Sequence, residues 1–192
     1  MEKTEIIRVA AVAGSLNKHS KTRMALKVVL EAAAASGAET HLIDLRDYDL
    51  VFCDGDDSSY TPDVFRLRQD VRQAHGIILG TPEYHSGYSG VLKNALDLMG
   101  FKEFQGKIVG LVGVAGGSTG AINSLNGLRT VCRSLRAWVV PNQVSISQGW
   151  KLFSDDGVLH DKQLEARLLE VGREVTRFAY LHHSAQAPEF LE

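Results

Sequence analysis

The chain has 192 residues, 44% of them apolar and 23% charged, with a formal net charge of −2. This composition is typical of a globular protein. It argues against nucleic acid as a partner, because nucleic-acid binding needs a clustered cationic surface. The apolar runs are shorter than the ~20 residues of a membrane helix, and the N-terminus lacks a signal-peptide core, so we expect a cytoplasmic protein without a membrane partner. Cys53 and Cys132 stand far apart outside any CxxC motif, which predicts reduced thiols and no metal site.

Strands and helices are predicted to alternate along the chain. In order, we predict a strand at residues 6–13, a helix from about 20 to 36, a strand at 40–45, a helix at about 62–74, a strand at 76–80, a helix at about 90–99, a strand at 107–114, a helix from about 120 to 135, a strand at 137–140 and a helix at about 161–181. Segment 145–159 is not assigned, and residues 182–192 are predicted to be a frayed tail.

The first strand, IIRVAAVA, is an almost continuous apolar run that ends at Gly14. A strand without polar alternation is typical of a parallel sheet covered by helices on both faces. Five such strands between five helices predict an α/β fold with a doubly wound five-stranded parallel sheet. Right-handed crossovers favour the flavodoxin-like strand order 2-1-3-4-5. We expect residues 1–181 to form one such domain.

Ligands of these sheets bind beyond the carboxyl ends of the strands, next to strand 1. Three polar loops are predicted to meet there, at residues 14–21, 81–89 and 115–120. All three contain glycine and follow apolar strands. This convergence predicts the binding site.

The first loop has the chemistry of a phosphate site. Its hydroxyls, its amide and the free N–H groups of a helix N-terminus favour an anion. The polar residues are Ser15, Asn17, Ser20 and Thr22, and the cations are Lys18, His19, Lys21 and Arg23. An alternative is that Ser20 only caps the helix. Neither GxGxxG nor a Walker A motif is present, which favours a mononucleotide over a dinucleotide.

Four blocks together resemble the NADPH-dependent FMN reductase family, which has a flavodoxin-like fold and includes FMN, quinone, azo and chromate reductases. They are Gly14-Ser-Leu-Asn with Ser20, then Thr81-Pro-Glu-Tyr-His-Ser, then Val91-Leu-Lys-Asn-Ala-Leu-Asp, and Gly116-Gly117. The resemblance runs from about residue 6 to 140, and the second and third blocks are its most specific part.

This resemblance implies an FMN site. The phosphate would be held by Ser15, Asn17, Ser20 and Thr22, with Lys21 added for its charge; Pro82, Glu83, Tyr84, His85 and Ser86 would line the ribityl chain and ring; Gly116, Gly117 and Ser118 would approach the pyrimidine edge. The sequence departs from the family at Asn17, where arginine is usual, and at His85, where asparagine is frequent. Glu83 and Tyr84 have an alternative role, capping and packing the following helix.

The implied activity is an NAD(P)H oxidoreductase that passes hydride from NADPH or NADH through FMN to a small acceptor, with ping-pong kinetics. The flavin carries the chemistry, so no side chain is named as catalytic. The resemblance also implies a homodimer or homotetramer, in which residues 54–57, otherwise a solvated loop, could rim a neighbouring site. The alternatives are a flavodoxin-type electron carrier, which the low charge and the loop AGGSTG without an aromatic residue disfavour, and a flavin-free interaction module. The acceptor, the preferred nicotinamide, the tightness of FMN binding and a monooxygenase partner stay open.

Overall fold

The computed structural model describes residues 6–154 and 156–183. The elements are, in chain order, β1 (Arg8–Ala13), α1 (Lys21–Ala35), β2 (Glu39–Asp44), η1 (Leu45–Asp47), η2 (Asp57–Ser59), α2 (Pro62–Gln73), β3 (Gly76–Tyr84), β4 (Gly87–Tyr88), α3 (Gly90–Asp97), α4 (Phe101–Phe104), β5 (Ile108–Val114), α5 (Ile122–Ser134), β6 (Trp138–Ile146), α6 (Gly149–Leu152) and α7 (Lys162–His183). No helix in these ranges is both long and apolar enough to cross a membrane.

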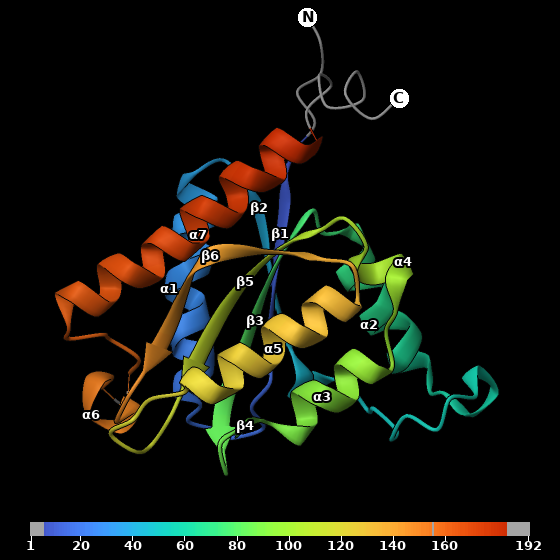
Figure 1. The fold of residues 1–192 in the computed structure, drawn as a ribbon, viewed down its shortest axis with the longest axis horizontal. Coiled ribbons are helices and arrows are strands. Elements are labelled where there is room, and N and C mark those ends of the chain that lie inside the picture. The colour runs from blue at the N-terminus through green and yellow to red at the C-terminus, as the bar shows by residue number, and fades with distance from the viewer. Residues whose placement is uncertain (1–5, 155, 184–192) are drawn as a thin grey trace, which may run out of the picture.

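Five strands form a parallel sheet in the order β2-β1-β3-β5-β6. This is the predicted order 2-1-3-4-5, because β4 is a short antiparallel addition that pairs only with β3. The order reverses beside β1, where the chain first moves outward to β2 and then crosses back to β3. The carboxyl ends of all five strands lie at the lower edge of the sheet in Figure 1.

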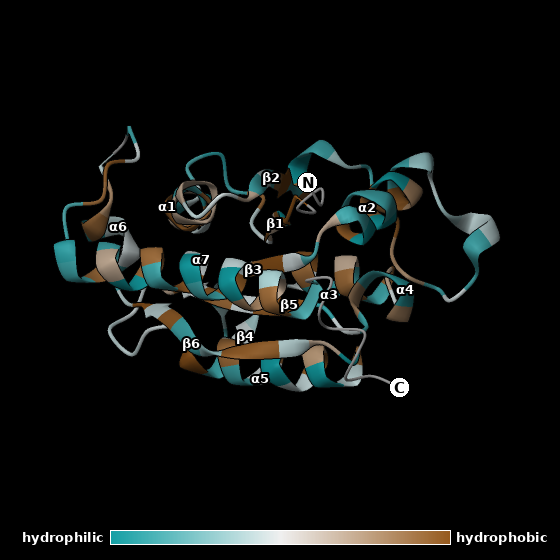
Figure 2. Ribbon diagram, turned by 90° about the horizontal axis from the view of Figure 1, so that it is seen from above, coloured by the Kyte–Doolittle hydropathy of each residue, from teal (hydrophilic) through white to brown (hydrophobic). Residues whose placement is uncertain are grey.

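Helices cover both faces of the sheet. One apolar cluster joins α1 and α7 to one face, and a second joins α2, α3 and α5 to the other. Side chains alternate along β1, so Val9 and Ala11 belong to the first cluster, whereas Ala10 and Val12 belong to the second. In Figure 2 the strands β3, β5 and β6 carry long brown stretches, while the helices show both colours. The apolar strands are therefore buried because helices cover both of their sides.

Strand β6 is longer than predicted, since it runs from Trp138 to Ile146 rather than ending at residue 140. Its pairing with β5 shifts between Val109 and Leu111, which marks a bulge. Pro141 lies in this bulge on the edge strand, where a missing N–H is tolerated. The second half of β6 was not predicted, because the bulge interrupts the apolar pattern that predicts strands.

Other boundaries also differ from the prediction. The helix expected at 90–99 ends at Asp97, and a further turn, α4, follows. Helix α7 continues through His183, two residues into the expected tail, while residues 184–192 lie outside the described part. Strand β3 extends to Tyr84 and forms a hairpin with β4 where a loop was predicted.

Candidate functional site

The loops after β1 and β3 are held together by buried hydrogen bonds. The N–H of Gly14 donates to the carbonyl of Gly80 at 2.9 Å. The hydroxyl of Ser89 donates to the carbonyl of Gly14 at 2.6 Å and accepts from the N–H of Leu92 at 3.1 Å, so it also caps α3. A Cβ on Gly14 would lie 2.7 Å from the Cβ of Leu92. Glycine is therefore required where β1 ends, because α3 packs directly against it.

A cavity of about 200 Å³ opens among these loops at the carboxyl edge of the sheet. Its lining residues are Ser15, Asn17, His19, Ser20, Lys21, Thr22, Pro82, Glu83, Tyr84, Val114, Ala115, Gly116, Gly149 and Trp150. The structure thus brings together the predicted residues of the first loop with Pro82, Glu83, Tyr84 and Gly116. It does not place His85, Ser86, Gly117 or Ser118 on the cavity wall. The convergence of the three loops follows from the parallel order of their strands.

The N-terminus of α1 forms the polar end of this cavity. Ser20 is the N-cap, and its hydroxyl accepts from the N–H of Arg23 at 3.1 Å. The remaining N–H groups of the first turn have no partner within the helix, and Lys21 and Thr22 of that turn line the cavity. Ser15 and Thr22 are buried and line the cavity. This end of the cavity has donors and a favourable helix dipole for an anion.

Two of the cations expected to add charge to this site have partners elsewhere. The ammonium of Lys21 donates to the carbonyls of Phe153 and Ser154, at 3.2 and 3.3 Å. The guanidinium of Arg23 pairs with Asp44 at 3.0 Å and also donates to the carbonyl of Lys18. Both side chains thus link separate segments of the chain, and their contribution to an anion site stays a prediction.

Asp44 binds two arginines at the end of β2. Burial acts to raise the pKa of its carboxyl group, but hydrogen bonds from Arg46 and the charges of Arg46 and Arg23 outweigh it, so the pKa lies below its usual value. The carboxylate therefore stays ionised and keeps Arg23 turned toward β2.

The hairpin after β3 explains the positions of the TPEYHS residues. Glu83 accepts from the N–H of Ser124 at 3.0 Å and so caps α5, not the helix that follows it in sequence. His85 and Ser86 form the exposed two-residue turn, with φ values of 50° and 62°. Such a turn needs positive φ at both positions, which asparagine and glycine adopt most readily. His85 and Ser86 therefore lie outside the cavity, and Tyr84 just before them is 57% exposed at its wall.

In the loop after β5, the fold itself does not require glycine at positions 116 and 117. A Cβ on Gly116 or Gly117 would have no other atom within 4 Å, and neither residue has a positive φ. Gly120 differs, because it has φ of 77° and a Cβ there would lie 2.5 Å from the hydroxyl oxygen of Ser145. Gly116 thus leaves open space on the cavity side, as expected where a ligand approaches bare backbone.

Sequence reasoning missed part of the cavity wall. Gly149 and Trp150 belong to α6, in the segment that was left unassigned. The N–H of Gly149 donates to the carbonyl of Ala115 at 3.1 Å, and this bond brings α6 to the end of β5. Val114, the last residue of β5, was also missed, whereas His19 and Ala115 lie in the loops predicted to form the site.

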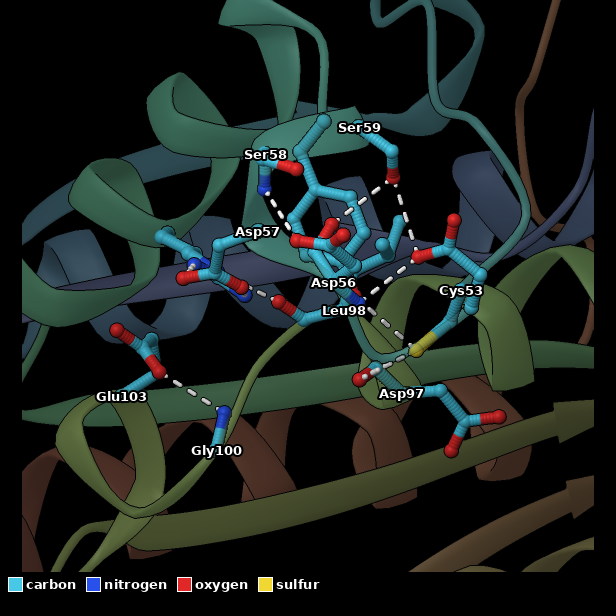
Figure 3. A network of polar contacts seen from close by, with 12 residues as sticks. Cys53, Asp56, Asp57, Ser58, Ser59, Asp97, Leu98, Gly100 and Glu103 are labelled. Carbon is cyan, nitrogen blue, oxygen red and sulfur yellow. Dashed lines mark hydrogen bonds and ion pairs between the residues drawn. The ribbon is translucent and has the colours of Figure 1, made fainter.

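The acidic loop, residues 54–57, does not line the cavity. Figure 3 shows polar contacts of Cys53, Asp56 and Asp57 in and beside this loop. The N–H of Cys53 donates to the side-chain oxygen of Asn94 at 3.0 Å, and its thiol contacts the carbonyl of Asp97. Both carboxylate oxygens of Asp57 accept from Arg68, whose hydrogen bonds hold the pKa of Asp57 below its usual value. Residues 54–57 are exposed to solvent, as predicted, and the loop is also fixed to neighbouring helices through Cys53 and Asp57.

Comparison with known proteins decides the family. Residues 7–151, most of the chain, match the NADPH-dependent FMN reductase family.

The chain belongs to the NADPH-dependent FMN reductase family.

Relatives in this FMN reductase family include two named azoreductases. An NADPH azoreductase of Bacillus sp. (strain OY1-2) is 34% identical over 179 residues, covering 89% of this chain and 97% of the relative. An FMN-dependent NADPH-azoreductase of Staphylococcus aureus (strain USA300) is 34% identical over 168 residues, covering 82% and 88%. The expected family, FMN as cofactor and NADPH as electron donor are thereby confirmed.

Solved structures support the fold of this FMN reductase. The flavoenzyme FerB, an NAD(P)H:(acceptor) oxidoreductase from Paracoccus denitrificans, superposes with a TM-score of 0.78 at 23% identity, covering 92% of this chain and 99% of that one. An archaeal flavodoxin superposes with a TM-score of 0.63 at 11% identity, covering 91% and 99%. The fold is therefore flavodoxin-like, while the family match makes the protein an oxidoreductase enzyme and does not favour an electron carrier.

Proposed function

We propose that the cavity at the carboxyl edge holds FMN, and that the enzyme uses NADPH to reduce azo compounds there. The observation that carries this proposal is the meeting of the α1 N-terminus and the open backbone of Gly116 in one cavity. The first offers an anion site and the second offers space for a planar ring beside bare backbone. Azo compounds are proposed because both relatives described above are named as azoreductases.

The phosphate group would be held mainly by neutral donors. The hydroxyls of Ser15 and Thr22 and the first-turn N–H groups of α1 are the groups that the cavity offers. Asn17 also lines the cavity, but its side-chain oxygen accepts from the N–H of His19 at 2.8 Å, so its amide NH₂ remains to donate. The helix dipole then supplies the favourable potential that a nearby arginine would otherwise give.

The ring would lie toward the second and third loops. Pro82 and Tyr84 line the cavity from the hairpin, and Gly116 lines it from the loop after β5. Glu83 keeps these two parts in place, because its carboxylate caps α5, which follows the third loop. When bound, FMN supplies the hydride-accepting chemistry, and the protein supplies its position and excludes competing geometries.

The finer expectations stay proposals. We propose that the partner is a small-molecule acceptor, with no nucleic acid or membrane, that the protein is a homodimer or homotetramer, and that it is cytoplasmic. Analytical ultracentrifugation of the FMN-loaded protein tests the oligomeric state, and fractionation of cells that express the chain tests the location.

The decisive test is an absorbance spectrum before and after anaerobic addition of NADPH. Flavin bands near ~450 nm that bleach, and that return when an azo dye is added, support the proposed function. Bands that persist with both NADPH and NADH refute nicotinamide-driven reduction. A protein that neither contains nor binds FMN refutes the cofactor site itself.

A further inference from the structure

Trp150 is the large side chain of the cavity that the proposed FMN site does not use. It comes from α6 and lines the same cavity as Tyr84, which comes from the β3 hairpin. Both residues are more than half exposed, at 63% and 57%. Aromatic side chains that stay exposed at a concave site are available to stack on a planar ring.

The backbone before Trp150 is fixed to the glycine loop after β5. A Cβ on Gly149 would lie 2.6 Å from Cγ1 of Val114, so α6 packs directly on the end of β5. Gln148 adopts a left-handed conformation with φ of 48°, and its N–H donates to the carbonyl of Gly117 at 3.0 Å. A non-glycine residue in this region is strained and persists only where its surroundings hold it. The backbone at Trp150 is therefore held at a defined position.

The residues that follow α6 are also fixed to the rest of the protein. The ammonium of Lys21 donates to the carbonyls of Phe153 and Ser154, which follow α6. Lys151 lies over the indole of Trp150, with its Nζ 4.9 Å from the ring centroid, and also bonds the side chain of Gln148 at 3.1 Å. This cation lies against one face of the ring, so a planar ligand would stack on the opposite face.

We propose that Trp150, together with Tyr84, determines specificity for the acceptor, because its free indole face stacks on a planar aromatic acceptor such as an azo-linked ring. This inference rests on the proposed function. A compact acceptor without a ring, such as ferricyanide, cannot stack on that face, so Trp150 does not strengthen its binding. The indole therefore favours aromatic over non-aromatic acceptors.

The chain contains a matched control for this residue. Trp138 is 65% exposed and is the first residue of β6, whereas α6 follows the last residue of that strand. Trp138 does not line the cavity. Trp150→Ala and Trp138→Ala thus each remove one exposed indole, the first at the cavity and the second away from it. Trp150→Phe keeps a smaller ring at the proposed site.

The test is a titration of the oxidised, FMN-loaded protein with the azo dye Methyl Red, followed by calorimetry without any nicotinamide. We expect Trp150→Ala to raise the Kd for the dye about fivefold, Trp150→Phe to raise it less, and Trp138→Ala to leave it unchanged. In turnover with NADPH, the ratio of kcat/KM for Methyl Red to that for ferricyanide should fall about fivefold in Trp150→Ala.

Three results would overturn the inference. One is an unchanged Kd for the dye in Trp150→Ala, which would make Trp150 an ordinary surface residue. Another is a rise in the Kd for FMN as large as that for the dye, which would assign Trp150 to the cofactor. The third is a fall in kcat/KM for ferricyanide in Trp150→Ala that equals the fall for Methyl Red. A wild-type flavin that NADPH does not reduce refutes the proposed function, whereas the dye titration needs no nicotinamide and still decides the role of Trp150.

Discussion

Replacing Gly116 by alanine separates what the ligand needs from what the fold needs. Gly116 lines the cavity, and a Cβ there would have no protein atom within 4 Å. Its φ is outside the left-handed region. Gly116→Ala should therefore leave the free energy of unfolding of the apoprotein unchanged or raise it by up to about 1 kcal/mol, because alanine restricts the unfolded chain. The same methyl group occupies space that we assign to the flavin ring.

The expected loss of FMN affinity can be converted into a thermal shift. Overfilling a packed site costs about 1–3 kcal/mol, so the Kd for FMN should rise about fivefold or more, with about tenfold corresponding to about 1.4 kcal/mol. At free FMN of about 100 times the wild-type Kd, binding stabilises the wild type by about 2.7 kcal/mol and the variant by about 1.4 kcal/mol. At about 2–4 °C per kcal/mol for a chain of this size, FMN should raise Tm by about 5–11 °C in the wild type and about 3–6 °C in the variant.

The assay is thermal unfolding by circular dichroism with and without FMN, combined with a fluorescence titration of FMN. Gly90→Ala is the matched control, because a Cβ on Gly90 also meets no atom within 4 Å and Gly90 does not line the cavity. It should leave the Kd for FMN unchanged. The reasoning is refuted if Gly116→Ala destabilises the apoprotein by more than about 1 kcal/mol, or if it binds FMN as tightly as the wild type.

Three further variants test the scaffold around the site. Gly14→Ala places a Cβ 2.7 Å from that of Leu92, so urea unfolding should show a loss of about 1–3 kcal/mol, and a stability equal to wild type would contradict the packing described. His85→Asn should raise the unfolding free energy by up to about 1 kcal/mol, because asparagine tolerates the φ of 50° better; a lower urea midpoint would contradict this. Burial lowers the pKa of Lys107 from 10.5 to about 8, so the unfolded chain binds more protons between these values and stability from this group rises with pH there. The stability of the wild type relative to Lys107→Met should increase across that range by up to about 3 kcal/mol, and a pH-independent difference would count against it.

The stability of the wild type is compared with that of Lys107→Met because a second buried group, Cys132, also makes stability depend on pH. Burial raises the pKa of the Cys132 thiol to about 12, so the unfolded chain loses that proton first and stability from this group falls as pH rises above its usual value. The two effects oppose each other in the wild type. Cys132 is present in both proteins, so its contribution cancels and the slope that remains belongs to Lys107.

The sequence by itself determined the sheet and the place of the site. Apolar runs without alternation predicted buried parallel strands, and the strand–helix alternation predicted their order, which the structure confirms. Parallel order then requires the loops after β1, β3 and β5 to meet, whatever their side chains do. The local signal for Ser20 as a helix cap, given as an alternative, was sufficient as well, because an N-cap depends on residues only three positions apart.

Only the tertiary structure decided which side chains face the cavity. The partners of Lys21 are 132 and 133 residues away in the chain, and the helix that Glu83 caps begins about 40 residues after it. Trp150 reaches the cavity through a bulged strand and a left-handed residue, both of which break the periodic pattern that sequence reasoning reads. Periodicity reports burial along one element, whereas a hydrogen bond between distant segments depends on how those elements pack. For that reason the polar loops could be located from the sequence, whereas the contacts of Lys21 and Arg23 and the location of Trp150 could not.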